Sequence, residues 1–227
     1  MNSLKLRIPL LIFDVNETLL DLRDLKVAVK TALNGDDDAV RLWFERTLHY
    51  SLVDSATESY HDFDRIGAAC LRMLASERDL PLSEEDAMET MSLFRQSPPH
   101  KEVPDALEAF ATFGYRMVAL SNSSSNALHT QLTFAGIDSC FEQILSVESL
   151  KLYKPHRKVY LWAAKQMNTQ PKNCLFIAAH AWDVAGAMAA GMQTAFIQRS
   201  GQSPYPLIPQ TTYTEPDLLM LHNVLTS

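Results

Sequence analysis

Through the second half of the chain, segments with hydrophobic residues at helical spacing alternate with short apolar runs. Leu107, Phe110 and Phe113 recur at helical spacing after Pro104, and Gly114 follows them as a stop. Short apolar runs between such segments have the length and composition of buried strands. The pattern predicts helices over 102–114, 125–136, 154–167 and 182–191, and strands over 115–121, 142–147, 173–178 and 193–198, the last of them closing the series.

The stretch IFD at residues 12–14 adds a strand near the N-terminus. Strands that alternate with helices of about ten residues are typical of βαβ units, so the fold class is α/β, a doubly wound parallel sheet with helices on both faces. In such sheets, ligands bind outside the carboxyl ends of the strands. Asp14, Ser121 and the segment 178–183 all lie at the ends of predicted strands, and Lys154 opens a helix beside them, so we expect all four at one edge of the sheet.

Residues 21–97 interrupt this alternation. They are rich in helix formers and contain no clear strand, and Ser97-Pro98-Pro99 marks a return to the earlier pattern. We therefore predict an α/β core domain made of residues 1–20 and 98–227, with a helical cap over 21–97 inserted after the first strand.

Composition narrows the function classes. The 227 residues are 47% hydrophobic and 21% charged, with a net charge of −7, which is typical of a globular protein. No basic cluster accompanies this charge, so neither nucleic acid nor an anionic membrane is expected as the main partner. The apolar run Leu10–Phe13 is too short for a signal or a membrane span, and a buried thiol is expected at Cys174, so the predicted location is cytoplasmic.

A lone acid such as Asp14 after a strand is as often a helix cap as a catalytic group. The order of further polar residues at element ends strengthens the catalytic interpretation: Thr18, then Ser121 with Asn122, then Lys154, then Asp183. Simpler interpretations stay open at two of these places. Ser121 and Asn122 could cap the next helix, and Lys154 could be a solvated lysine.

Four motifs in this order resemble the haloacid dehalogenase superfamily: FDVNETL, LSNS, YKP and AWDVAGA. Phosphatases of that superfamily carry a second aspartate two residues after the nucleophile, where it acts as acid and base. Here Asn16 stands in that place, and an amide cannot carry protons, so phosphoryl transfer is disfavoured. The type II 2-haloacid dehalogenases lack the second aspartate, and RLWFERTLHYSLV, HKEVPDAL and LSVESLKLYKP are similar to that branch.

The resemblance implies a mechanism and a set of roles. An aspartate displaces halide from the α-carbon of a 2-haloacid and forms an ester, which water then hydrolyses, without metal or cofactor. Asp14 would be the nucleophile, and Asp183 would orient Lys154 and help to position the water. Thr18 and Lys154 would hold the Asp14 carboxylate, and Ser121 and Asn122 would bind the substrate carboxylate. Further substrate-binding residues, which would line the pocket, are Tyr160, Phe63, Trp43 and Phe44. Family members often form homodimers, so a homodimer is a further expectation.

The chain departs from the family pattern at three positions. Phe44 follows Trp43 where an arginine normally receives the halide, and Ala178 and His180 replace a serine and an asparagine. His180 would either bond to halide or activate water as a catalytic residue, or be a structural histidine. Two alternatives therefore stand beside 2-haloacid dehalogenation: a Mg²⁺-dependent phosphatase using the same Asp14, and a member that has lost catalysis.

Overall fold

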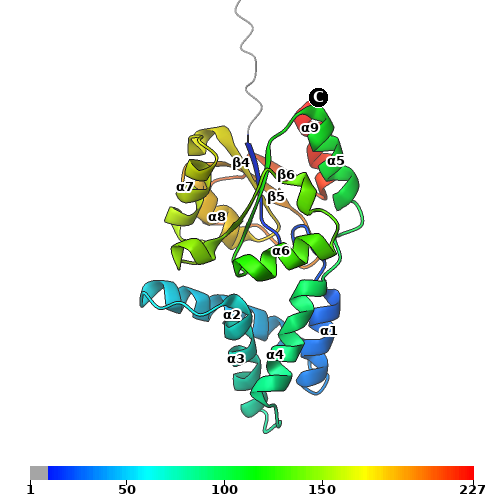
Figure 1. The fold of residues 1–227 in the computed structure, drawn as a ribbon, viewed down its shortest axis with the longest axis vertical. Helices are drawn as coiled ribbons and strands as arrows, with labels where there is room; N and C mark the ends of the chain where they lie inside the picture. The colour runs from blue at the N-terminus through cyan, green and yellow to red at the C-terminus, as the bar shows by residue number, and fades with distance from the viewer. Residues whose placement is uncertain (1–9) are drawn as a thin grey trace, which may run out of the picture.

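The computed structural model describes residues 10–227, and the part of the predicted core before Leu10 lies outside this range. Its centre is a six-stranded parallel sheet with the order β3-β2-β1-β4-β5-β6 (Figure 1). The first strand of the chain therefore lies in the middle, between β2 and β4, where the direction of winding reverses. The strands are β1 (Leu10–Phe13), β2 (Met117–Ser121), β3 (Gln143–Ser146), β4 (Cys174–Ala178), β5 (Gln193–Ile197) and β6 (Tyr213–Glu215).

Helices cover both faces of this sheet, because alternate residues of each buried strand point to opposite sides. Leu11 and Phe13 pack with one group of helices, and Leu10 and Ile12 pack with the other. The first group is α5 (Val103–Phe113), α6 (Ser125–Phe134) and α9 (Leu218–Thr226), and the second is α7 (Arg157–Gln166) and α8 (Ala181–Ala189). Short 3-10 turns join the elements at η2 (Asp138–Cys140), η3 (Val147–Leu150) and η4 (Pro171–Asn173). The α/β fold class predicted from the sequence is confirmed.

Between β1 and α5 the chain forms a separate group of helices below the sheet in Figure 1. The elements are α1 (Arg23–Ala32), α2 (Asp37–Ala56), α3 (Phe63–Ser76), α4 (Glu84–Ser92) and η1 (Leu93–Gln96). The amide of Gln131 on α6 donates to the Phe94 carbonyl (3.0 Å), which ties η1 to the core. We propose that these helices form the cap predicted for residues 21–97.

The C-terminal part of the chain differs from the sequence-based expectation. The strand at 193–198 does not close the series, because β6 pairs with β5 and α9 packs beside α5. The strand YTE is short and half-exposed at the sheet edge. It carries no run of apolar residues, which is why the hydrophobic pattern missed it.

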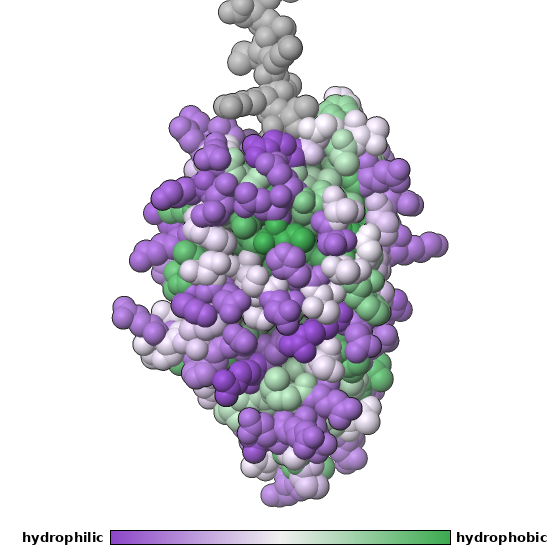
Figure 2. Space-filling model, in the orientation of Figure 1, coloured by the Kyte–Doolittle hydropathy of each residue, from purple (hydrophilic) through white to green (hydrophobic). Residues whose placement is uncertain are grey.

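The face of the molecule seen in Figure 2 is largely hydrophilic, with apolar side chains in small groups. The apolar residues instead fill the two layers on either side of the sheet and the interior of the cap. In the range 10–227, no helix has both the length and the apolar character needed to cross a membrane.

Candidate active site

Asp14 lies directly after β1, at the point where the winding of the sheet reverses. Its amide donates to the Ile177 carbonyl of β4 (3.0 Å), so the backbone is fixed by the neighbouring strand. Thr18 Oγ1 donates to Asp14 Oδ2 (2.6 Å) and accepts from the Ala179 amide (2.9 Å). The second contact orients the hydroxyl, so its proton is directed at the carboxylate. Ligands of open α/β sheets bind at this position.

Lys154 joins two carboxylates below the surface of the site. Its Nζ donates to Asp14 Oδ1 and to Asp183 Oδ2, both at 2.7 Å, and to the Leu120 carbonyl at 3.1 Å. The other oxygen of Asp183 accepts from the Tyr160 hydroxyl. Lys154 is 1% exposed and Asp183 is fully buried, so this network is closed to solvent in the present arrangement.

Close packing of α8 fixes this geometry. A β-carbon added at Gly186 would lie 2.6 Å from the Tyr160 hydroxyl and 2.7 Å from the Pro155 carbonyl oxygen. Such distances leave no room for a side chain, so only glycine lets α8 approach the segment that follows Lys154. The small residues of AWDVAGA therefore bring Asp183 within bonding distance of the lysine.

The charges around Asp14 favour its ionised form. Burial alone would raise its pKa, but the charge of Lys154 and the nearby charge of His180 hold it well below the usual range. Burial and the nearby charge of Asp14 raise the pKa of Asp183 to about 6, although the charge of Lys154 opposes this shift. Burial would lower the pKa of Lys154, but its two carboxylate partners raise it. Asp14 is thus an unprotonated carboxylate at neutral pH, as a nucleophile requires.

Asn16 occupies the place of the missing second acid. Its Nδ2 donates to Ser123 Oγ (3.3 Å), and its Oδ1 accepts from Gln131 Nε2 (3.0 Å). Both ends of the amide are thus held by buried neutral groups. Asn16 supports the loop, and it offers no proton to a leaving group.

Ser121 and Asn122 lie at the end of β2, in contact with the Lys154 segment. Asn122 Oδ1 accepts from the Lys154 amide (3.0 Å), while its buried Nδ2 has no hydrogen-bond partner within the described residues. Ser121 Oγ accepts from the Ser123 amide (3.1 Å). The Asn122 side chain therefore holds the Lys154 loop and keeps one donor group for a ligand.

His180 lies beside Asp14, the candidate nucleophile, and both of its ring nitrogens face a carboxylate. Its Nδ1 lies 3.5 Å from Asp14 Oδ2, which is an ion-pair distance but longer than a good hydrogen bond. Its Nε2 lies 2.8 Å from Glu17 Oε2. The ring stacks on Phe44 (5.6 Å between centroids) and on Trp182 (5.3 Å).

The predicted aromatic residues divide between the site and the protein interior. Phe44 stacks on His180, and Tyr160 bonds to Asp183 from behind the network. Trp43 is 1% exposed and donates to the Gly67 carbonyl (2.9 Å), and Phe63 packs on Phe94 and Tyr153. Trp43 and Phe63 therefore stabilise the cap interior, and a substrate-binding role for either stays a prediction.

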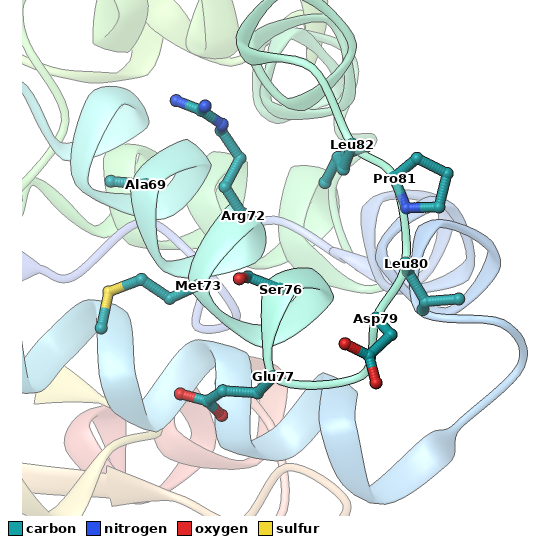
Figure 3. A pocket seen from close by; sticks show the side chains of 9 residues that line it. All are labelled: Ala69, Arg72, Met73, Ser76, Glu77, Asp79, Leu80, Pro81 and Leu82. Carbon is teal, nitrogen blue, oxygen red and sulfur yellow. The ribbon is translucent and has the colours of Figure 1, made fainter.

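A cavity of about 680 Å³ leads from the surface to His180. Glu17, Phe44, His180 and Trp182 form its inner end, and α1, α2 and residues 200–202 form its walls. A second pocket, on the cap at the end of α3, is lined by residues from Ala69 to Leu82 (Figure 3). The second pocket is not lined by His180, whereas the first is, and His180 Nδ1 lies 3.5 Å from Asp14 Oδ2, so the cavity at His180 is the candidate entrance.

Sequence reasoning did not select four residues that the structure brings into the site. Glu17 contacts His180 and Lys26, Trp182 stacks on His180, and Gln131 bonds to Asn16. Glu17 lies in the same short loop as Asp14, and Trp182 is adjacent to the predicted Asp183, so proximity in sequence was an available signal for these two. Lys26 and Gln131 lie on helices with no such signal.

Comparison with known proteins agrees with this geometry. The family model for haloacid dehalogenase-like hydrolases matches residues 8–191. The chain belongs to this family. The resemblance predicted from the four sequence motifs is thereby confirmed, as is the expectation of a hydrolase.

The relatives of this haloacid dehalogenase-like hydrolase include characterised dehalogenases. A haloacetate dehalogenase of Moraxella sp. (strain B) is 30% identical over 86% of this chain and 88% of its own length. An (S)-2-haloacid dehalogenase of Pseudomonas putida is 26% identical over 95% of both chains. An L-2-haloacid dehalogenase structure from Xanthobacter autotrophicus, with chloropropionic acid covalently bound, superposes with a TM-score of 0.89 at 20% identity, covering 97% of this chain and 99% of that one. The last comparison shows that the two proteins share a fold.

Because of the ion pairs of His180, we expect this hydrolase to lose stability as the pH becomes alkaline. Burial would lower the pKa of His180, but the charges of Asp14 and Glu17 and the hydrogen bond to Glu17 raise it from 6.5 to about 9. A group whose pKa is raised in the folded state stabilises that state fully at pH values below its unfolded-state pKa. This contribution is lost as the pH rises through the folded-state pKa. We expect the free energy of unfolding to fall by up to about 3 kcal/mol between pH 6.5 and pH 9.5.

Thermal unfolding at these two pH values checks this expectation. His180→Asn should flatten the alkaline loss, whereas His129→Gln, at an exposed position on α6, should keep it. An equal alkaline loss in His180→Asn and in the wild type would contradict the expectation.

Proposed function

We propose that this protein hydrolyses the carbon–halogen bond of small 2-haloacids through an ester on Asp14. The observation that carries this proposal is the environment of Asp14: an ionised carboxylate, held by Lys154 and Thr18 at the switch point of the sheet, with an amide in place of the second acid. Such a group can attack carbon directly. A halide leaves as a stable anion and needs no proton donor at Asn16.

The relatives support the chemical class of the substrate. The Pseudomonas putida relative is an (S)-2-haloacid dehalogenase, and the Moraxella relative acts as a haloacetate dehalogenase. In this chain, Ser121 and Asn122 are the residues proposed to hold the substrate carboxylate, and the buried Nδ2 of Asn122, which has no partner within the described residues, supports this role. The cavity at His180 has room for a short organic acid.

Halide release from both enantiomers of 2-chloropropanoate, with 2-hydroxypropanoate measured in parallel, tests the proposed reaction. Equal amounts of halide and hydroxy acid are the expected result. If neither enantiomer, nor haloacetate, yields halide above the uncatalysed rate, the proposed reaction is wrong.

Activity is expected to survive exhaustive chelation. The two carboxylates nearest the reacting position, Asp14 and Asp183, are both bonded to the Lys154 ammonium, and the displacement of halide requires no Lewis acid. Within residues 10–227, no cluster of three or more His, Cys, Asp or Glu side chains is arranged to hold a metal ion. Halide release should therefore be the same before and after treatment with EDTA.

A phosphatase would respond differently to the same treatment. Hydrolysis of p-nitrophenyl phosphate that EDTA removes and Mg²⁺ restores, together with no release of halide, would assign Asp14 to phosphoryl transfer. A known Mg²⁺-dependent phosphatase treated in parallel shows that the chelation was complete.

A further inference from the structure

Glu17 has an unusual place for a glutamate. Its backbone has a φ of +63°, in the left-handed region that residues with a side chain seldom adopt. Its carboxylate is nevertheless directed inward, with the residue 8% exposed. Oε2 meets His180 Nε2 at 2.8 Å, and Oε1 forms an ion pair with Lys26. The loop after β1 thus holds this carboxylate against His180 in spite of an unfavourable backbone conformation.

These contacts leave one nitrogen of His180 available for chemistry. Glu17 occupies Nε2, and Phe44 and Trp182 stack on the two faces of the ring at interplanar angles of 25°. The remaining nitrogen, Nδ1, is directed toward Asp14 and makes no hydrogen bond within the described residues. The ring is therefore fixed in position, with a free nitrogen beside the nucleophile.

Asp183 is poorly placed to activate water. Its Oδ2 accepts from Lys154 and its Oδ1 from the Tyr160 hydroxyl, and the residue is fully buried. His180, in contrast, lines the cavity of about 680 Å³ through which water would arrive. The geometry thus favours His180 over Asp183 as the group that meets the hydrolytic water.

We propose that Glu17 and His180 form a carboxylate–imidazole pair for the second half of the reaction. His180 Nδ1 is the general base that takes a proton from the water attacking the Asp14 ester. Glu17 is a positioning residue, which orients the ring and stabilises its protonated form. The proposal rests on the proposed function, because the ester is its substrate.

The proton balance of the cycle follows from the charges. An Asp14 oxygen forms a bond to the α-carbon, and the carbon–halogen bond breaks with its electron pair on the halide. The ester is neutral, so His180 loses one of its two anionic partners and releases its Nδ1 proton to solvent through the cavity. The free Nδ1 is then ready to act as a base.

Hydrolysis restores the starting state. Water attacks the ester carbonyl carbon of Asp14 while Nδ1 takes its proton, and the intermediate then breaks the acyl carbon–oxygen bond. The departing hydroxy acid oxygen takes the proton from His180, and the new Asp14 carboxyl group returns one to it. The sum is haloacid plus water to hydroxy acid, halide and one proton.

Several charged groups face His180 and enter any dependence on pH. Asp14 and Glu17 are its direct partners, from the loop after β1. The groups across the cavity are Arg23, Lys26 and Lys30 on α1 and Asp37, Arg41 and Glu45 on α2. Only Glu17 both contacts the ring and stays anionic after Asp14 has been esterified, so it is the group to change.

Rapid-quench measurements on the full chain with (S)-2-chloropropanoate test the proposal. In Glu17→Gln, the first turnover should release about one halide per protein at the wild-type rate, and hydroxy acid release should slow by about ten- to a hundredfold. In His180→Asn it should slow by about a hundred- to ten-thousandfold. Intact-protein mass spectrometry should then show the ester, with the adduct on Asp14 after digestion.

The pH dependence separates positioning from simple packing. The rate of ester hydrolysis should rise with pH as His180 loses its proton, and Glu17→Gln should move this rise to lower pH because an anion beside the ring is lost. Glu77→Gln removes a carboxylate from an ion pair with Arg46 on the cap surface, and should leave both rates and the pH profile unchanged.

Each result decides between the two proposals. A wild type that releases no halide would overturn the proposed function itself. If the wild type turns over while Glu17→Gln and His180→Asn accumulate no ester, or lose the halide burst and the turnover equally, the Glu17–His180 pair is not the base. If Glu17→Gln fails to fold, Glu17→Gly removes the same carboxylate at a backbone angle that glycine adopts freely, and the same criteria apply.

Discussion

Asp14→Asn is expected to release halide from a 2-haloacid at least about a thousandfold more slowly than the wild type, since an amide is a poor nucleophile. The fold should survive. Without the Asp14 charge, Lys154 still pairs with Asp183 and His180 still pairs with Glu17, so no buried charge is left alone. Initial rates of halide release and circular dichroism of the same preparation measure both effects.

Asp105→Asn is the matched control for this substitution. Asp105 is exposed in the first turn of α5 and lies outside the site, so its amide variant should keep the wild-type rate. An Asp14→Asn variant that retained more than about a tenth of the wild-type rate, which corresponds to a barrier change of only about 1.4 kcal/mol, would remove Asp14 from the mechanism.

Much of the core could be predicted from the sequence because buried parallel strands are nearly continuous apolar runs. The segments MVAL and CLFIA are apolar along their whole length and are bounded by polar residues or turns. The same reasoning could not find β6, since an edge strand is half-exposed and YTE carries no apolar signal. The order of the strands likewise depends on contacts between distant segments, which periodicity does not report.

The candidate site was predictable to the extent that the ends of strands share one edge. Asp14, Lys154 and Asp183 meet there as expected, and so do Thr18 and Asn122. The sequence could not show that His180 would be held by Glu17. That contact depends on a positive φ at Glu17 and on the stacking of Phe44 from the cap, and neither leaves a pattern along the chain.

The departures at Phe44 and His180 form one arrangement with Glu17. The ring of Phe44 stacks on the imidazole ring of His180, and the Glu17 carboxylate lies beside His180 Nε2. The site therefore places a cationic group at His180, next to the proposed nucleophile Asp14, although position 44 carries none.

Lys154→Met is expected to destabilise the fold by about 3–5 kcal/mol and to abolish activity, because it leaves two buried carboxylates without their cation. Asp183 is fully buried, so water cannot replace the ammonium there, and Asp14 keeps only the charge of His180, 3.5 Å away. Thermal and denaturant unfolding at pH 7 measure the loss. Lys172→Met, at an exposed position in η4, should be close to the wild type in both stability and rate.

A second substitution separates the electrostatic effect from simple loss of packing. Adding Asp183→Asn to Lys154→Met removes one of the two stranded charges, so part of the lost stability should return while activity stays absent. The difference in free energy of unfolding between Lys154→Met and the wild type should also shrink as the pH falls toward about 4. A carboxyl group whose pKa is raised in the folded state destabilises that state only at pH values where the group would ionise on unfolding. If the double variant is no more stable than Lys154→Met at pH 7, and the deficit does not change with pH, Lys154 contributes through packing and not as the shared cation of the two carboxylates.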